Sequence, residues 1–288
     1  MRKIKEFIIE KLILICGVTS IFFVVLIFLF LLKEGLAIFK TVSPFKFLFG
    51  EKWYPISEPG QFGILPLILG SLMVTIGAAV ISVPIGVACA VYIAEIAPTQ
   101  IKEILKGGIE LLAAIPSVVL GFIGMVTLVP LVKNIFHLPT GLTALSGSIM
   151  LAFMAMPTIV SIAEDALYSV PKNYKEGAFA LGATHWQMIY RVMLPAASSG
   201  IFAAVMLGIG RVIGETMAVM MITGNAAVIP HSILVPVRTL TATIAAEMGE
   251  AVVGSEHYFA LFAIGIVLFL ISFAVNVTAD LFLHKRQR

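Results

Sequence analysis

Arg211 and Glu215 carry ionisable side chains inside an otherwise apolar stretch, GIGRVIGETMAV, which runs from Gly208 to Val219. A charged residue near the centre of a membrane helix costs roughly 2.5 to 3.5 kcal/mol, so we expect both side chains to face protein or water. A separation of four residues predicts one shared helical face, on which the two charges reduce each other's penalty. Arginine stays protonated, and its planar fork can donate two hydrogen bonds to an oxyanion. The pair is therefore either part of an anion path or a structural brace between two helices.

Small and hydroxylic residues accompany this pair. Gly210 and Gly214 have GxxxG spacing, which lets a second backbone approach closely. Thr75 and Ser117 lie in two other apolar runs, and their hydroxyls could bind a passing anion. Hydroxyls in membrane helices more often bond to their own backbone or to a neighbouring helix, so these two are weaker candidates. Glu164, near the end of another apolar run, is expected to be a solvated acid.

Composition indicates that these residues lie on membrane helices. The chain has 288 residues, of which 60% are hydrophobic and 12% charged, and its mean hydropathy is +1.06. Soluble chains contain about half apolar and a quarter charged residues, so this is an integral membrane protein. A spanning helix needs roughly 20 mostly apolar residues. We therefore predict an all-α bundle with six spans, near residues 12–32, 64–94, 108–132, 142–163, 196–222 and 258–282.

Lysine and arginine are distributed unequally over the expected loops. If the N-terminus is cytoplasmic, twelve of the 19 basic residues fall inside, six fall outside, and Arg211 remains within a span. Positive charge accumulates on the cytoplasmic side of membrane proteins, so both termini are predicted to be cytoplasmic. The net charge of +3 reflects this topology and gives no reason to expect nucleic-acid binding.

The first apolar run is predicted to be a retained anchor, because no small-residue cleavage pattern follows it. We divide the chain into this anchor with an outer loop, residues 1–63, and a membrane core, residues 64–288. The chain contains no GxxxxGK[ST], HExxH or GxSxG motif, and its histidines show no metal-ligand spacing. We therefore expect no cofactor, no metal site and no ATP hydrolysis by this chain.

The polar segment between the fourth and fifth spans is predicted to form two short helices. Pro171 suits a first helical turn, and Gly182 suits a left-handed helix end. Thr184 and Gln187 have capping-box spacing, and Pro195 suits the first turn of the fifth span. The segment is either an ordinary interfacial linker or a docking surface for a partner. Its apolar candidates for such a surface are Ala178, Leu181, Trp186, Ile189 and Tyr190.

The same segment carries a spaced set of residues: Glu176, Gly177, Ala178, Gly182, Val192, Leu194 and Pro195. This pattern resembles the EAA loop of ABC-importer permeases, EAA-x3-G-x9-I-x-LP, with Gly177 and Val192 as mild departures. In that family the short helix of the loop is a coupling helix that docks in a groove of the ATPase subunit. The resemblance therefore implies ATPase coupling by Glu176, Gly177, Ala178, Gly182, Leu194 and Pro195, within an EAA loop of about residues 164–195.

Four longer segments extend the resemblance over most of the chain: ELLAAIPSVVLGFIG, MAMPTIVSIAEDALYSVP, EGAFALGATHWQMIYRVMLPAASSGI and GRVIGETMAVMMITGNA. Together they resemble the permeases of ABC-type phosphate importers, and GETMAVMMITGN and the tail LTATIAAEMGEAVVGSEHYFALFAIG are more similar to PstC than to PstA. The resemblance implies a type I ABC importer permease bundle in the inner membrane. It also implies a PstA-like second permease, ATPase subunits, an external phosphate-binding protein, inorganic phosphate and membrane lipid as partners.

Within this resemblance, Arg211 would attract phosphate along an apolar path, and Glu215 would balance its charge when the anion is absent. Two alternatives stay open. A permease for sulfate or molybdate would share the loop and an anion-friendly interior. A secondary transporter or channel would need no ATPase, but it leaves the spacing from Glu176 to Pro195 unexplained.

Overall fold

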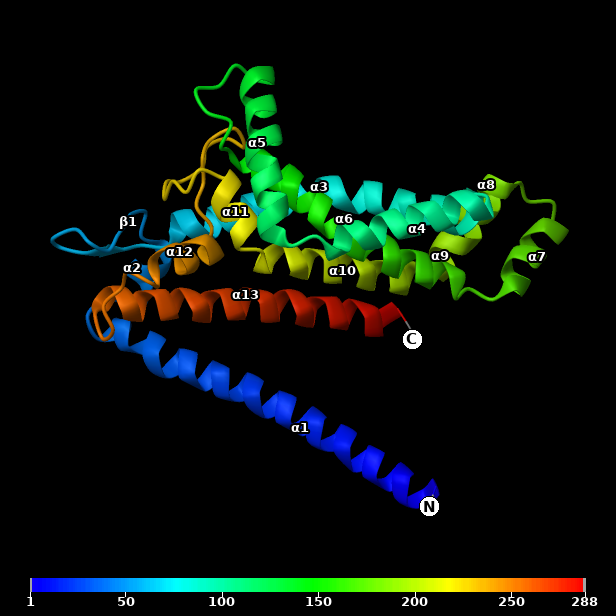
Figure 1. Cartoon of the computed structure of the whole chain (residues 1–288), viewed down its shortest axis with the longest axis horizontal. Coiled ribbons are helices and arrows are strands. Elements are labelled where there is room, and N and C mark those ends of the chain that lie inside the picture. Colours follow the sequence, from blue (N-terminus) through cyan, green and yellow to red (C-terminus); the bar gives the residue numbers. More distant parts are fainter. Residues whose placement is uncertain (1, 287–288) are drawn as a thin grey trace.

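The computed structural model describes the backbone of residues 2–286 and the side chains of residues 7, 9–278 and 281. This part of the chain is a helical bundle with a single short β-hairpin (Figure 1). Five helices in it are long and apolar enough to cross a membrane. A sixth span is present if the bent pair His185–Ala196 and Ser198–Gly214, which meet at 70°, counts as one.

The long helices are α1 (Arg2–Gly35), α3 (Leu65–Val91), α5 (Ser117–Ile135), α6 (Ala144–Tyr168), α10 (Ser198–Gly214) and α13 (Glu256–Arg286). The shorter helical segments are η1 (Leu36–Lys40), α2 (Pro44–Phe49), η2 (Tyr92–Ile96), α4 (Thr99–Ala114), α7 (Lys172–Ala180), α8 (His185–Met188), η3 (Ile189–Met193), α9 (Leu194–Ala196), α11 (Met217–Ile222) and α12 (Leu240–Glu247). Strands β1 (Trp53–Tyr54) and β2 (Gln61–Phe62) pair antiparallel, with Trp53 opposite Phe62.

The centre of the bundle is α6, which packs against both α3 and α10. Small residues permit this approach. Ile159 of α6 is fully buried, and a Cβ atom added at Gly86 of α3 would lie 2.9 Å from its side chain. An added Cβ at Gly208 of α10 would lie 2.5 Å from the same side chain. Glycines on the two flanking helices therefore make room for one large residue between them.

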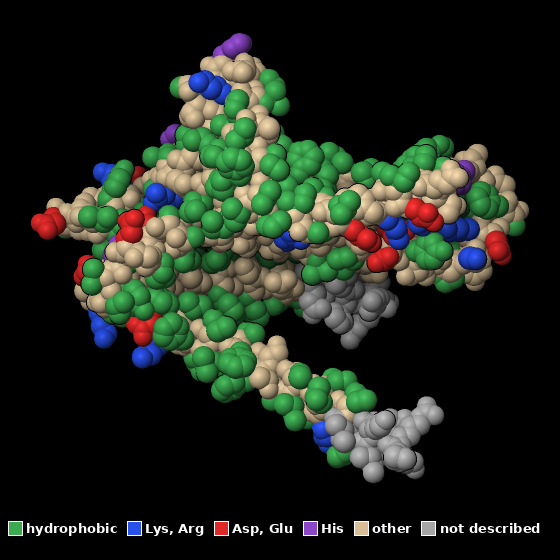
Figure 2. Space-filling view, in the orientation of Figure 1, with side chains coloured by type: hydrophobic (Ala, Val, Ile, Leu, Met, Phe, Trp, Pro, Cys, Tyr) green, Lys and Arg blue, Asp and Glu red, His purple; other side chains and the backbone are tan. Residues whose placement is uncertain are grey.

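The bundle has two distinct ends. We call residues 36–64 and 223–255 the hairpin end and residues 169–197 the loop end (Figure 1). Figure 2 shows apolar side chains over much of the visible face, while charged side chains gather mainly toward these two ends. This distribution is the one expected of a protein whose middle is in lipid.

Helix α1 diverges from the rest of the bundle (Figure 1). It contacts α13 near its C-terminal end, where the Phe28 and Phe269 rings stack at 4.5 Å and the Phe30 and Phe262 rings meet edge to face. Most of its other described side chains are apolar and exposed. A helix that is apolar all round requires lipid or another subunit around it.

Two predicted spans have different boundaries in the structure. The third does not begin near residue 108, because α4 ends at Ala114 and α5 begins at Ser117. Pro116 lacks a backbone N–H and holds Ile115 in an extended conformation, which separates the two helices. The fifth is not continuous over residues 196–222, because it is interrupted at Glu215 and Thr216.

Candidate functional site

Arg211 and Glu215 do not share a helical face, contrary to the prediction. Helix α10 ends at Gly214, and Glu215 has an extended backbone with φ −70° and ψ 132°. The Glu215 carboxylate accepts a hydrogen bond from the Ala218 backbone N–H, 3.2 Å away, at the start of α11. An acid stabilises the free N–H groups of a helix start, and Gly214 is a poor helix former, so the helix breaks between the two charges. Among the described residues, no ion pair joins Arg211 to Glu215.

Arg211 lies on an open face of α10. Leu207, Gly210, Arg211 and Gly214 are all exposed and recur at the three- and four-residue spacing of one helical face. A Cβ atom added at Gly210 or at Gly214 would meet nothing within 4 Å. Within the described part of the chain, no hydrogen bond or ion pair occupies the Arg211 guanidinium. An unpaired arginine in a membrane span must be covered by another subunit or by water.

Glu215 lines a small pocket together with Thr75 of α3, and the pocket has a volume of about 10 Å³. Such a volume holds about one water molecule and is too small for a larger anion. Arg211 and Ser117 do not line it. Ser117 lies elsewhere, in the first turn of α5. The structure therefore brings together Glu215 and Thr75, but not all four residues predicted for the substrate path.

Sequence reasoning missed Thr239 and Thr241, which also line this pocket. The Thr241 hydroxyl donates to the Glu215 carbonyl oxygen at 2.9 Å, and the Thr239 hydroxyl caps α12 by accepting from the Ala242 N–H. The hydroxyl-rich run RTLTAT was the available signal. Both hydroxyls bond to backbone groups, which is the ordinary behaviour of threonine at helix ends.

The loop end has the predicted two-helix form. Helix α7 is followed by Gly182 with φ +79°, a left-handed conformation that favours glycine. Thr184 and Gln187 form the predicted capping box at the start of α8. Pro195 does not begin the fifth span, because it lies in the short α9 segment and the chain bends at Ala197 before α10.

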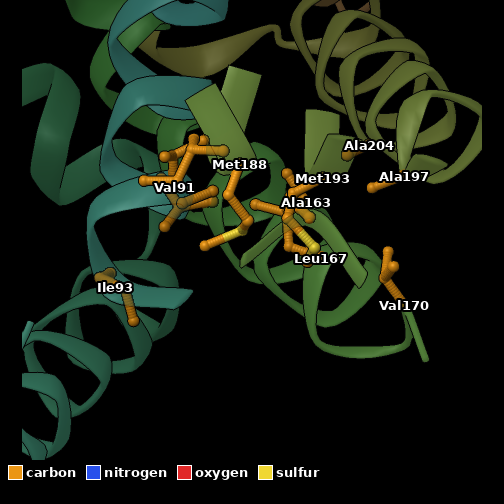
Figure 3. Close-up of a cluster of buried hydrophobic side chains, with 13 residues drawn as sticks. Val91, Ile93, Ala163, Leu167, Val170, Met188, Met193, Ala197 and Ala204 are labelled. Carbon is orange, nitrogen blue, oxygen red and sulfur yellow. The ribbon is translucent and has the colours of Figure 1, made fainter. Parts of the chain in front are cut away.

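Few side chains of the loop end pack against the interior of the bundle. Ala178 is the buried residue of α7, and it joins a cluster with Val170, Met188 and Met193 (Figure 3). The same cluster contains the fully buried Leu167 of α6.

Several large apolar side chains of the loop point outward. Leu181 is 91% exposed, and Trp186 and Tyr190 are also exposed, so of the five predicted apolar candidates only Ala178 and Ile189 are buried. Glu176 is exposed, and added Cβ atoms at Gly177 and Gly182 would meet nothing within 4 Å. An open surface of this composition is typical of a protein-binding site.

Near the loop end, buried carboxylates form ion pairs that connect neighbouring helices. Glu164 of α6 is 2% exposed and is not the solvated acid that was expected. Its two oxygens contact the ammonium groups of Lys102 and Lys106 of α4 at 3.0 and 2.7 Å. The hydrogen bond to Glu164 raises the pKa of Lys106. Glu95 of η2 makes a similar pair with Lys175 of α7, at 2.6 Å.

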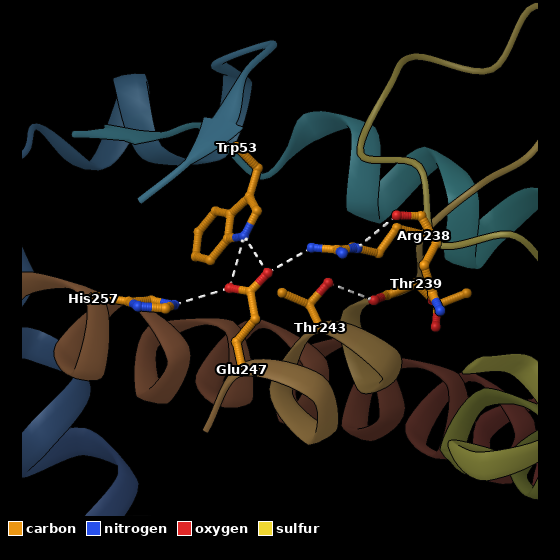
Figure 4. A network of polar contacts seen from close by, with 7 residues as sticks. Trp53, Arg238, Thr239, Thr243, Glu247 and His257 are labelled. Carbon is orange, nitrogen blue, oxygen red and sulfur yellow. Dashed lines mark hydrogen bonds and ion pairs between the residues drawn. The ribbon is translucent and has the colours of Figure 1, made fainter. Parts of the chain in front are cut away.

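A single carboxylate organises the hairpin end (Figure 4). The indole N–H of the buried Trp53 lies 3.0 Å from Glu247 Oε2, and His257 Nε2 lies 2.8 Å from the same oxygen. The Arg238 guanidinium donates to Glu247 Oε1 and also, at 3.0 Å, to the Asn225 carbonyl oxygen. Glu247 thereby joins the hairpin, α12, α13 and the loop before α12.

Residues 82–288 match the model of a protein family described as the binding-protein-dependent transport system inner membrane component. This chain belongs to that family. Its sequence is also similar to curated permeases. It is 44% identical over 260 residues to the probable ABC transporter permease protein YqgH of Bacillus subtilis, which covers 90% of this chain and 84% of the relative.

Two further relatives are phosphate transport system permease proteins PstC. The protein from Mesorhizobium japonicum is 36% identical over 260 residues, with 84% of this chain and 79% of the relative covered. The protein from Haemophilus influenzae is 35% identical over 261 residues, with 84% and 82% covered. The resemblance to PstC permeases predicted from the sequence is therefore confirmed.

Solved structures share the fold at low sequence identity. A chain of the bacterial alginate ABC transporter has a TM-score of 0.66 and 15% identity, with 93% of this chain and 92% of that chain covered. A chain of the inward-facing MetNI methionine ABC transporter has a TM-score of 0.63 and 18% identity, with 81% and 100% covered. The predicted fold class, an all-α ABC importer permease bundle, is confirmed, and the chain is a multi-pass inner membrane protein.

Proposed function

We propose that this chain is a permease subunit of an ATP-driven inorganic phosphate importer. The observation that carries the proposal is its 35–36% identity to PstC phosphate permeases over 84% of the chain. The unpaired Arg211 in a membrane helix agrees with an anionic substrate, because a guanidinium can bind two phosphate oxygens at once.

In this proposal the open face of α10 borders the substrate path. A PstA-like second permease covers Gly210 and Gly214, whose lack of side chains leaves space for its backbone. Arg211 then lies between the two subunits and attracts the anion. Glu215 contributes negative charge nearby, which favours release, and Thr75 offers a hydroxyl from α3. Ser117 is the weakest candidate, because it lies outside the Glu215 pocket.

The loop end is assigned to the cytoplasm in this proposal, and the hairpin end to the outer side. This orientation puts both termini inside and follows the twelve-to-six distribution of basic residues, of which Arg288 lies outside the described residues. ATPase subunits would dock on the exposed side of the loop, over Glu176, Gly177 and Gly182. Ala178, Leu194 and Pro195 would hold that surface on the bundle, and Ala178 already packs inward.

Transport would proceed by alternating access. An external phosphate-binding protein delivers phosphate at the hairpin end of the permease pair. ATP binding closes the two ATPase subunits and draws the coupling helices together, and the bundle changes the side on which the path is open. This chain supplies half of the path and one coupling helix, and the ATPase subunits supply hydrolysis.

The test is radiolabelled phosphate uptake in importer-deficient cells that express the full partner set, with and without this chain. Excess sulfate or molybdate is added as a competitor. Saturable uptake that requires this chain and ignores both competitors is expected. Competition by sulfate or molybdate would assign the permease to another oxyanion, and flux that persists without ATPase subunits would favour a secondary transporter.

A further inference from the structure

Among the residues whose side chains are described, the coupling helix α7 has one charged contact with the membrane bundle. Lys175 Nζ lies 2.6 Å from Glu95 Oε1, which belongs to a residue 80 positions earlier in the chain. The Glu95 side chain is only 5% exposed, and the Lys175 side chain is 29% exposed. No other hydrogen bond or ion pair reaches the Glu95 carboxylate among the described residues. Lys175 is therefore the neutralising partner of a buried charge.

Little else holds α7 to the helices of the bundle. Its most extensive contacts are with α8 and η3 of its own loop. Ala178 alone of its residues is buried, and it joins a cluster with residues of α3, η2, α6, α8 and η3. The ion pair is therefore the direct contact that joins α7 to η2, the continuation of α3.

Helix α3 connects this contact to the candidate substrate path. Glu95 lies in η2, a π-helical turn that continues α3 without a break. Thr75 lies twenty residues earlier on the same helix, about 30 Å away at 1.5 Å per residue, and lines the pocket of Glu215. π-Helical turns are rare and frequently occur at functional sites. A second one, η3, lies in the same loop-end cluster.

We propose that the Lys175–Glu95 ion pair is the mechanical link through which displacement of the coupling helix moves α3 and thereby the substrate path. The proposal rests on the proposed function, since it assigns these residues a positioning role in ATP-driven import. Because the two charged groups are in direct contact, a displacement of α7 in either direction along the Lys175–Glu95 line would move η2 with it. The large apolar side chains of α7, Tyr174 and Phe179, are exposed and do not belong to the cluster that contains Ala178.

The experiment uses the complete importer in proteoliposomes, with binding protein, and measures anion uptake and ATP hydrolysis in parallel. The decisive variant is Glu95→Leu/Lys175→Met, because replacing a buried ion pair with apolar residues is often tolerated by the fold. It should assemble and hydrolyse ATP while the anion imported per ATP falls at least about 5-fold, the lower range of coupling between sites. The reversed pair, Glu95→Lys/Lys175→Glu, should recover most of the ratio.

Glu103→Gln is the matched control, because Glu103 is an exposed acid of α4 near the same end of the bundle. It should leave the ratio unchanged. An unchanged ratio in Glu95→Leu/Lys175→Met would overturn the proposal. Equal losses of assembly and hydrolysis in that variant and in the reversed pair would assign a structural role instead. If the unmodified importer transports sulfate or molybdate but not phosphate, the proposed substrate fails, and the ratio is measured with the transported anion.

Discussion

Two regions of the molecule each place an arginine near a glutamate, and the two pairs behave differently. At the hairpin end, Arg238 and Glu247 are in contact, and the same carboxylate also contacts Trp53 and His257. In the middle of the bundle, Arg211 and Glu215 are separated by the end of α10, and Arg211 has no partner among the described residues.

The two arginines differ in whether their charge is already paired within the protein. Glu247 accepts hydrogen bonds from three donors, so its charge holds four segments together. Arg211 retains all its donors and lies beside glycines that leave space around it. Burying an unsatisfied charge in a membrane is costly, and such residues commonly mark substrate pathways.

The largest expected effect is on transport at Arg211. Arg211→Gln should reduce phosphate uptake at least about 100-fold, because two charge-assisted hydrogen bonds, each worth about 1.5–3 kcal/mol, are lost. The assembled complex, measured by co-purification of the partner subunits, should be unchanged. Arg211→Lys keeps the charge but not the planar fork, so it should retain more uptake than Arg211→Gln. Loss of assembly in Arg211→Gln would indicate that Arg211 has a structural role and does not belong to the substrate path.

The next effect is on stability at the hairpin end. Glu247→Ala removes the acceptor of Arg238, Trp53 and His257 and should destabilise this end by about 3 kcal/mol, as expected for breaking a largely buried pair. A lower melting temperature of the purified importer is the readout. Glu250→Ala, at an exposed acid nearby, is the control and should melt like the unmodified protein. Equal melting of the two variants would show that the network is not structural.

Glu215 should show an intermediate effect that depends on the substitution. Glu215→Gln keeps an oxygen that can accept from the Ala218 N–H, whereas Glu215→Ala loses this cap and about 1 kcal/mol of stability. Uptake by Glu215→Gln should therefore fall less than uptake by Arg211→Gln, with normal melting. A larger loss in Glu215→Gln than in Arg211→Gln would make Glu215, and not Arg211, the principal charge of the path.

The smallest effects are expected at the hydroxyls. Thr75→Val removes a hydroxyl from the Glu215 pocket and should lower uptake about 5-fold, equivalent to one neutral hydrogen bond of about 1 kcal/mol. Ser117→Ala, outside that pocket, should lower uptake less than Thr75→Val does. Initial uptake rates are measured at equal expression. A larger loss of uptake in Ser117→Ala than in Thr75→Val would indicate that the substrate path lies closer to α5.

Much of this architecture follows from local sequence. Apolar runs predicted the spans, and Gly182, Thr184 and Gln187 predicted the form of the loop, because each has a conformation or a capping partner within a few residues. The break after Gly214 was missed because the apolar run continues through it. The hydrogen bond from the Ala218 N–H to the Glu215 carboxylate, which favours a break over a continuous helix, depends on where α11 begins.

Charge pairs between residues far apart in the chain also could not be predicted from the sequence. Glu164 was expected to be solvated because it lies near the predicted end of a span, and its lysine partners are about sixty residues away on α4. Glu95 and Lys175 are likewise distant in sequence. Sequence periodicity identifies the face of a helix, but it does not identify the residue opposite that face.

The most direct test compares Arg211→Gln with Arg238→Gln in one assay that reports phosphate uptake per assembled complex. We expect Arg211→Gln to assemble fully and to import almost no phosphate. We expect Arg238→Gln to yield less complex, with nearly normal uptake by the complex that forms. Normal uptake per complex in Arg211→Gln, or loss of assembly in that variant, would contradict the assignment of Arg211 to the phosphate path.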